Sequence, residues 1–240
     1  MTTKLQYWIG LLCIGGILIA QTACDPLGTR GSGDLVTETR NETGFHAIKA
    51  SIPGKMEVLV DSVYKVEVTC EENIIDYLDT KVVDGVLEIN FDRNVYDVDK
   101  LKITVSAPSW DAFELSGSAN IDVQHAINGS NLDLEISGSG DIDLFKADFD
   151  KFNINISGSG NVALNGSGTD MECTVSGSGE LEALDCPVKT ADINVSGSGD
   201  VRLDVSTTLK VNISGSGTVE YKGDAEVTKN ISGSGRVRKI

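Results

Sequence analysis

The sequence predicts an all-β fold: a β-solenoid of stacked coils of about 20 residues, with a strand-rich N-terminal portion continuous with it. The tetrapeptide Ser-Gly-Ser-Gly, or a close variant, occurs seven times at spacings of 21, 20, 19, 20, 18 and 18 residues. Between the copies, valine, isoleucine and leucine alternate with polar residues, which is the period of a strand with one buried face. The copies begin at Ser116, Ser137, Ser157, Ser176, Ser196, Ser214 and Ser232.

Residues 1–23 have the features of a lipoprotein signal peptide. The apolar stretch Tyr7–Ala20 is shorter than the roughly 20 residues that cross a bilayer, so it is typical of a secretory leader. Gln21-Thr22-Ala23-Cys24 follows and resembles the lipobox of bacterial lipoproteins, although Gln21 departs from the usual aliphatic residue. This resemblance implies cleavage before Cys24 and acylation of its thiol, which would anchor the protein to a membrane. Ordinary cleavage after Ala23, which leaves a free thiol, is the alternative.

Residues 24–43 are polar and rich in glycine, threonine and glutamate, so we expect a flexible tether between the lipid and the fold. The predicted domain then covers 44–240, with an irregular strand-rich part over 44–115 and the repeat coils over 116–240. The expected location is the cell envelope, on the outer membrane. Asp25 would signal inner-membrane retention in enteric bacteria, so the sequence leaves the choice of membrane and leaflet open.

Strand signals begin well before the repeats. The alternating segments 56–60 and 64–68 flank Asp61-Ser62-Val63, which predicts a hairpin-like corner. Residues 73–78 suggest a short helical or irregular excursion. Asp84-Gly85 lies between two further strand segments and is a frequent hairpin turn.

The glycines of the repeat are expected to point into the coil. In the second copy Ile136, Gly140 and Ile142 share one parity and the serines share the other, so the alternation passes through the tetrapeptide without a phase slip. Glycine removes the inward side chain where two walls approach, and it tolerates the backbone of a bend. Ala119, at a glycine position of the first copy, agrees with this steric demand. The predicted inward glycines are Gly138, Gly158, Gly177, Gly197, Gly215 and Gly233.

Stacking the coils would align equivalent polar side chains in outward columns. Each tetrapeptide begins with a serine, and two residues upstream the later copies mostly carry asparagine, with Thr174 in one of them. Stacked amides can hydrogen-bond along the axis, as asparagine ladders do in cross-β structures. The columns are therefore interpreted either as structural or as an exposed face for a ligand. The candidate ladder comprises Ser137, Ser157, Ser176, Ser196, Ser214, Asn155, Asn194, Asn212 and Asn230.

The composition excludes several classes of partner. A formal charge of −16, from 20 basic and 36 acidic residues, argues against nucleic-acid binding, because a phosphate backbone requires a cationic surface. No CxxC motif or Cys/His cluster occurs, so neither a metal nor another cofactor is expected. Besides Cys24, the mature chain holds Cys70, Cys173 and Cys186, which allow at most one disulfide. We expect Cys173 and Cys186 to be reduced and partly buried.

Other short motifs carry little chemistry. Gly138–Leu144 resembles the calcium-binding nonapeptide of RTX toxins, but that repeat recurs every nine residues and carries an extra glycine pair. His46 and His125 have no nucleophile motif beside them, so no catalytic residue is assigned. Asp61-Ser62-Val63 resembles an acceptor for O-glycosylation in Bacteroidetes, with Ser62 as the residue that would be modified.

Several segments, taken in order, resemble one family. Phe113-Glu114-Leu115-Ser116-Gly117-Ser118-Ala119 opens the repeats, and the strand segments before it occur in the same order as in the head GIN domain family of auto-transporter adhesins, which is common in exported proteins of Bacteroidetes. The resemblance covers roughly residues 44–235. It implies a β-solenoid fold and an adhesive role, and it carries over no catalytic residues. The earlier segments are Phe45–Ile48, Lys55–Val60, Tyr64–Val68, Thr80–Leu87 and Lys102–Pro108.

The favoured function is non-enzymatic: a cell-envelope lipoprotein that acts as an adhesin, or as a binding or scaffold module. Its repetitive polar faces would suit an extended glycan or protein ligand, and its membrane contact would pass through the lipid anchor. One alternative is a β-helical polysaccharide lyase or glycosidase that uses outward carboxylates, which a cleft with converging carboxylates would favour. Another is a structural envelope protein without a ligand. The sequence leaves the ligand and the oligomeric state open.

Overall fold

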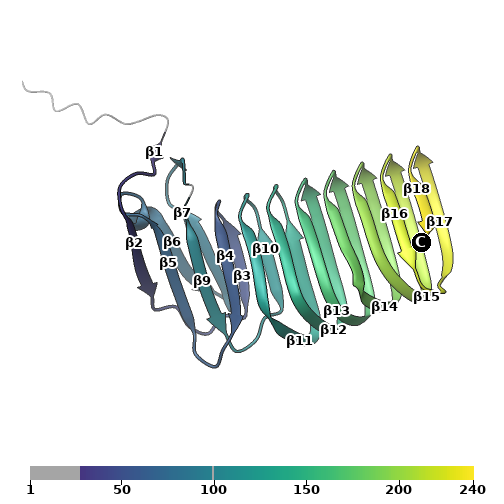
Figure 1. Ribbon diagram of the computed structural model, residues 1–240, viewed down its shortest axis with the longest axis horizontal. Helices are drawn as coiled ribbons and strands as arrows, with labels where there is room; N and C mark the ends of the chain where they lie inside the picture. Colours follow the sequence, from purple (N-terminus) through teal and green to yellow (C-terminus); the bar gives the residue numbers. More distant parts are fainter. Residues whose placement is uncertain (1–27, 99) are drawn as a thin grey trace, which may run out of the picture.

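The computed structural model describes residues 28–98 and 100–240. They form a rod of stacked coils (Figure 1), a β-solenoid of about six turns, which confirms the predicted fold class. Sixteen strands belong to one sheet, and β1 (Thr29–Arg30) pairs with β8 (Val95–Tyr96) in a second, two-stranded sheet. None of the described segments is a helix long and apolar enough to cross a membrane. The predicted signal peptide and Cys24 lie outside the described residues.

The N-terminal strands already belong to the two walls of the solenoid. On one wall β3 pairs in parallel with β10, and on the other β4 pairs in parallel with β11, so the irregular part is continuous with the coils, as expected. The strands of this part are β2 (Leu35–Arg40), β3 (Ala47–Ser51), β4 (Lys55–Val60), β5 (Lys65–Glu71), β6 (Leu78–Val83), β7 (Val86–Phe91), β9 (Lys102–Ala107) and β10 (Ala112–Leu115).

The prediction of a flexible tether over residues 24–43 is wrong for its described part. Strand β2 runs antiparallel to β5, from Leu35 opposite Glu71 to Arg40 opposite Val66. Alternation explains the pairing, because Val36 packs against the core while its neighbours Leu35 and Thr37 are exposed. The composition is polar, but valine and threonine favour a half-buried strand. Residues 24–27 lie outside the described part of the chain.

The hairpin-like corner at Asp61-Ser62-Val63 is also corrected. Strands β4 and β5 do not pair with each other, because β9 lies between them, parallel to β4 and antiparallel to β5. Two local predictions are confirmed: η1 (Ile75–Tyr77) is a 3-10 turn in the expected excursion, and β6 and β7 form a hairpin. Its turn residues Asp84 and Gly85 have positive φ of 51° and 83°.

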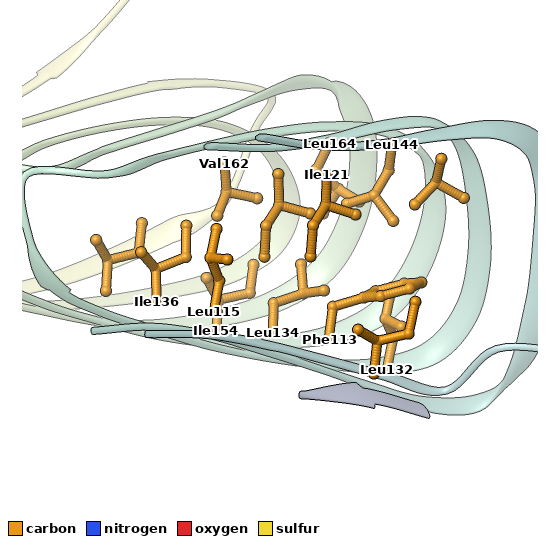
Figure 2. Close-up of a cluster of buried hydrophobic side chains, with 14 of the residues drawn as sticks. Phe113, Leu115, Ile121, Leu132, Leu134, Ile136, Leu144, Ile154, Val162 and Leu164 are labelled. Carbon is orange, nitrogen blue, oxygen red and sulfur yellow. The ribbon is translucent and has the colours of Figure 1, made fainter. Parts of the chain in front are cut away.

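From residue 120 onward each coil consists of two wall strands joined by a bend, and it pairs in parallel with the coil before it. Aliphatic side chains from both walls meet in the lumen, as Figure 2 shows for Phe113, Leu115, Ile121 and their neighbours. These side chains are nearly all inaccessible to solvent, so this lumen is the hydrophobic core. The strands are β11 (Asn120–Ile136), β12 (Asp141–Gly158), β13 (Asn161–Gly177), β14 (Glu180–Gly197), β15 (Asp200–Gly215), β16 (Thr218–Lys222), β17 (Glu226–Gly233) and β18 (Arg236–Lys239).

The two glycines of each tetrapeptide have different roles, which corrects the predicted set of inward glycines. The second glycine is the inward one: Gly160 is buried, and a Cβ there would lie 2.7 Å from Ile136 Cγ2 in the lumen and would also overlap the Gly140 carbonyl oxygen of the preceding coil. The first glycine is less buried and meets only the preceding coil, so a Cβ at Gly197 would overlap the carbonyl group of Gly177. The bend rotates the backbone out of strand alternation at this point, with a φ of 127° at Gly197. The same axial contact occurs at Gly138, Gly158, Gly177, Gly215 and Gly233.

In the last coil, two lysines occupy positions that are apolar and face the core in the earlier coils. Lys229 aligns with Val211 in a column that is otherwise apolar, and Lys239 aligns with Tyr221 and Leu203 on the other wall. Both lysines are exposed at the C-terminal end of the rod. A charge at an inward position of an edge strand discourages pairing with another chain, because that pairing would bury it.

We expect the double variant Lys229→Val with Lys239→Leu to associate through its C-terminal ends, because it restores two apolar columns next to free strand edges. Sedimentation velocity should show a larger species that grows with protein concentration and is absent from the wild type. Lys210→Val, on the outward side of the preceding coil, is the matched control and should behave as the wild type. Identical sedimentation of all three proteins would contradict this prediction.

Candidate functional site

The predicted asparagine and serine columns form on one wall of the solenoid. Asn155, Thr174, Asn194, Asn212 and Asn230 occupy equivalent positions in consecutive coils. The Asn212 Nδ2 group donates a hydrogen bond of 3.0 Å to Asn194 Oδ1, which is one rung of the expected ladder. Thr174 is too short to continue an amide ladder, so the column consists of mixed side chains over its length.

A shallow groove of about 260 Å³ runs along the later part of this column, hereafter the ladder groove. Its polar lining comes from Thr174, Asn194, Asn212 and Asn230 and from the serines Ser196, Ser214 and Ser232. The candidate serines Ser137, Ser157, Ser176, Ser196 and Ser214 are all exposed. Because the parallel ladder already pairs the backbone of the inner coils, a ligand here would meet side chains rather than free backbone groups.

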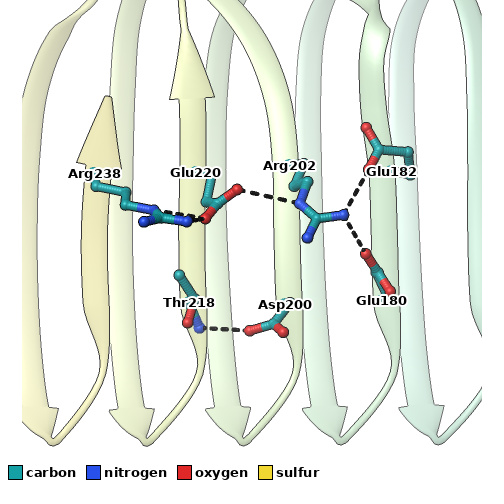
Figure 3. A network of polar contacts seen from close by, with 7 residues as sticks. All are labelled: Glu180, Glu182, Asp200, Arg202, Thr218, Glu220 and Arg238. Atoms are coloured by element: carbon teal, nitrogen blue, oxygen red, sulfur yellow. Dashed lines mark hydrogen bonds and ion pairs between the residues drawn. The ribbon is translucent and has the colours of Figure 1, made fainter. Parts of the chain in front are cut away.

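The opposite wall carries a row of ion pairs between coils (Figure 3). Arg202 bridges Glu180 and Glu182 of the preceding coil and Glu220 of the following one, at 2.9, 3.1 and 3.2 Å, and Arg238 also contacts Glu220. The hydrogen bond that Arg202 donates to Glu182 raises the pKa of Arg202, and the one that Arg238 donates to Glu220 lowers the pKa of Glu220. These charges are paired with each other, so this part of the wall offers few free groups to a ligand.

Three cysteines of the described residues are buried and unpaired: Cys70, Cys173 and Cys186. Cys173 and Cys186 are unpaired, as expected, but they are 1% and 0% exposed and so are more deeply buried than predicted. Burial raises the pKa of Cys70 to about 11 and the pKa of Cys173 and Cys186 to about 12. Thiols in this state are inert packing residues rather than nucleophiles, because the reactive species is the thiolate.

We expect the cysteines in a chain of residues 28–240 to react slowly with iodoacetamide at pH 8 while the chain is folded. In denaturant without reductant, three thiols should react rapidly. The unfolded thiols ionise near their ordinary pKa of 9, below the folded values. The stability that they contribute is therefore fully present below pH 9 and is lost as the pH rises through about 11 to 12. Fewer than three thiols after denaturation would reveal a disulfide and overturn the prediction.

A second hollow of about 600 Å³ lies at the bends opposite the Ser-Gly tetrapeptides, near the N-terminal end of the coils; we call it the bend hollow. Its polar lining comes from three successive coils: His46, then Ser109 and Asp111, then Asn128, Ser130, Asn131 and Asp133. Asp111 Oδ1 lies 2.8 Å from His46 Nδ1, and Asp133 accepts a hydrogen bond of 2.6 Å from Asn153. Phe149 is also part of the lining, beside Gly129.

The sequence reasoning missed the bend hollow, although the coil lengths carried a signal. Residues 124–131 separate the wall residues Val123 and Leu132 in the first coil, whereas only 204–208 separate Leu203 and Leu209 in a later one. The variation in repeat length therefore falls in these bends. The longest of these bends, residues 124–131, lies at the bend hollow.

The remaining single residues have simple surroundings. Ser62 lies in an exposed turn, where Asp61 Oδ1 accepts a hydrogen bond of 3.0 Å from the Val63 amide. His125 Nδ1 lies 3.0 Å from the Val60 amide nitrogen, so this histidine links two bends. Within residues 28–98 and 100–240, no group of three or more His, Cys, Asp or Glu residues could hold a metal ion.

The fold and its surface define a class: a two-walled parallel β-solenoid that presents columns of small polar side chains. A family described as "Putative auto-transporter adhesin, head GIN domain" matches residues 44–225, and the chain belongs to this family. The description of this family indicates an adhesin-type protein that is exported or lies at the cell surface.

Solved structures share the fold. A "putative adhesin" from Bacteroides fragilis has a TM-score of 0.84 at 23% identity, over 89% of this chain and 100% of that one. A "Putative lipid binding protein" from Parabacteroides distasonis has a TM-score of 0.74 at 24% identity, over 88% and 98%. A "putative adhesin" from Parabacteroides merdae has a TM-score of 0.71 at 22% identity, over 88% and 98%. Among curated proteins there is no match.

Proposed function

We propose that the protein is a non-enzymatic adhesin or binding module of the cell envelope, held by a lipid on Cys24, that binds an extended glycan or protein along the ladder groove. The column from Thr174 to Asn230 carries this proposal, because it repeats the same short polar side chains in register over consecutive coils. A repetitive face suits a repetitive or extended ligand, which can make the same contact at each coil.

Arrays of glycans and of matrix proteins test this function with the described chain. The double variant Asn194→Ala with Asn212→Ala removes the one amide rung and should weaken binding of the retained ligand by about tenfold or more. Asn161→Ala, an exposed amide on the opposite wall, is the matched control and should bind as the wild type. A wild-type protein that binds nothing on either array would favour a purely structural envelope protein.

The anchor has its own test, because it does not depend on the ligand. We expect mass spectrometry of the protein isolated from membranes to show an N-terminal Cys24 that carries acyl chains, with residues 1–23 absent. Cys24→Ala should release the protein from the membrane fraction. An unmodified Cys24 at the N-terminus, or a retained leader, would contradict the anchor.

The comparisons give no support to the alternative of a polysaccharide lyase or glycosidase. Such an enzyme would need two or three carboxylates that converge on one bond. In the bend hollow, Asp111 is engaged by His46 and Asp133 by Asn153, so both carboxylates already serve as hydrogen-bond acceptors. Binding therefore fits this surface better than catalysis does.

A further inference from the structure

We propose that the bend hollow is a second ligand site, separate from the ladder groove, and that it takes a neutral saccharide. The inference rests on the proposed binding role but concerns different residues on a different part of the rod. The hollow has about 600 Å³, within the range of roughly 300–1,000 Å³ that small-molecule sites occupy.

The side chains around the hollow have hydrogen-bonding capacity to spare. Ser109, Asn128 and Asn131 are exposed, and their side chains make no hydrogen bond with other described residues. Each asparagine offers two donors and one acceptor oxygen, and the serine hydroxyl offers both. In the ladder groove, by contrast, Asn212 already donates to Asn194.

Two of the polar groups are held in place by neighbours. The His46–Asp111 pair fixes an imidazole beside a carboxylate, and the bond from Asn153 fixes Asp133. Such a rim places acceptors and donors side by side, which matches the vicinal hydroxyls of a sugar, since each hydroxyl both donates and accepts. Val86 is partly exposed and adds apolar surface for the carbon face of a sugar ring, whereas Ala47 and Phe149 are each only 4% exposed.

The charge and the size of the lining select against other ligands. No lysine or arginine lines the hollow, whereas Asp111 and Asp133 do, so phosphates and acidic sugars would be repelled. Protein–protein interfaces usually bury large apolar or arginine side chains at their centre. The exposed side chains around the bend hollow are small and polar instead. A neutral saccharide fits both conditions.

The experiment titrates neutral oligosaccharides into the described chain, beside sialylated and phosphorylated ones, and measures dissociation constants by calorimetry. Asn128→Ala and Asn131→Ala should each lower the affinity for the bound neutral oligosaccharide about tenfold. Asn161→Ala, an exposed amide that lines neither the bend hollow nor the ladder groove, is the matched control and should leave this affinity unchanged. The ladder variant Asn194→Ala with Asn212→Ala is measured beside it to show which of the two sites the oligosaccharide occupies. Melting curves verify that all variants are folded, which we expect because the substituted side chains are exposed.

The outcomes separate this site from the proposed function. Loss of binding in the ladder variant but not in the two hollow variants would overturn the bend hollow and support the ladder groove. Preferred binding of sialylated or phosphorylated sugars would overturn the charge argument. If no saccharide binds while a matrix protein binds through the ladder groove, the bend hollow proposal fails and the proposed function stands.

Discussion

Gly197→Val should lower the melting temperature more than any exposed substitution in the repeats. The new Cβ would overlap the carbonyl group of Gly177, whose oxygen accepts a hydrogen bond of 2.8 Å from the Ser198 amide. The residue also has a φ of 127°, which a β-branched side chain adopts only with strain. Overpacking alone costs about 1–3 kcal/mol, and the strained backbone adds to it. Thermal unfolding followed by circular dichroism measures the combined loss of stability from overpacking and backbone strain.

Ser196→Ala and Ser198→Ala are the matched controls, because both serines lie next to Gly197 and are exposed. Each should change the stability by about 0.5 kcal/mol or less. If the tetrapeptides were flexible surface loops, all three variants would melt as the wild type does. That result would overturn the axial packing of the glycines.

The second large effect concerns one column of the core. Ile156→Ala should cost about 2–5 kcal/mol, because Ile156 is 1% exposed and has a coil on each side, so the lost side chain leaves a cavity. Ile231 occupies the same column in the last coil but is 37% exposed. Ile231→Ala removes the same atoms and should cost much less. Denaturant unfolding of both variants gives the comparison, and equal losses would mean that the solenoid end is covered in solution.

The sequence alone was sufficient for the fold class because the information is local and repeated. The alternation of Ile136 and its neighbours with polar residues defines the walls, and the spacing of the tetrapeptides defines the coil. The same pattern predicted the outward columns, since residues at equivalent positions of stacked coils must align. The Asn194–Asn212 rung follows directly from that alignment.

What the sequence could not predict depends on contacts between distant segments. Strand β9 enters between β4 and β5 because of pairing with residues about 40 positions away, and no local signal marks that choice. The direction of Gly197 depends on the rotation of the backbone within the bend, which strand parity does not describe. The bend hollow joins His46, Asp111 and Asn131 from three coils, so it exists only after the coils are stacked.

The pairing of β1 and β2 with the body of the rod limits how far a lipid on Cys24 could let the protein move. Had residues 24–43 been a flexible chain, their average reach would be about 25 Å in any direction. With Thr29 already held against Val95, the stretch from Cys24 to Thr29 can span at most about 17 Å even when fully extended. An acylated protein would therefore stay close to the bilayer at its N-terminal end. The distance that its surface extends from the bilayer would come from the length of the rod itself.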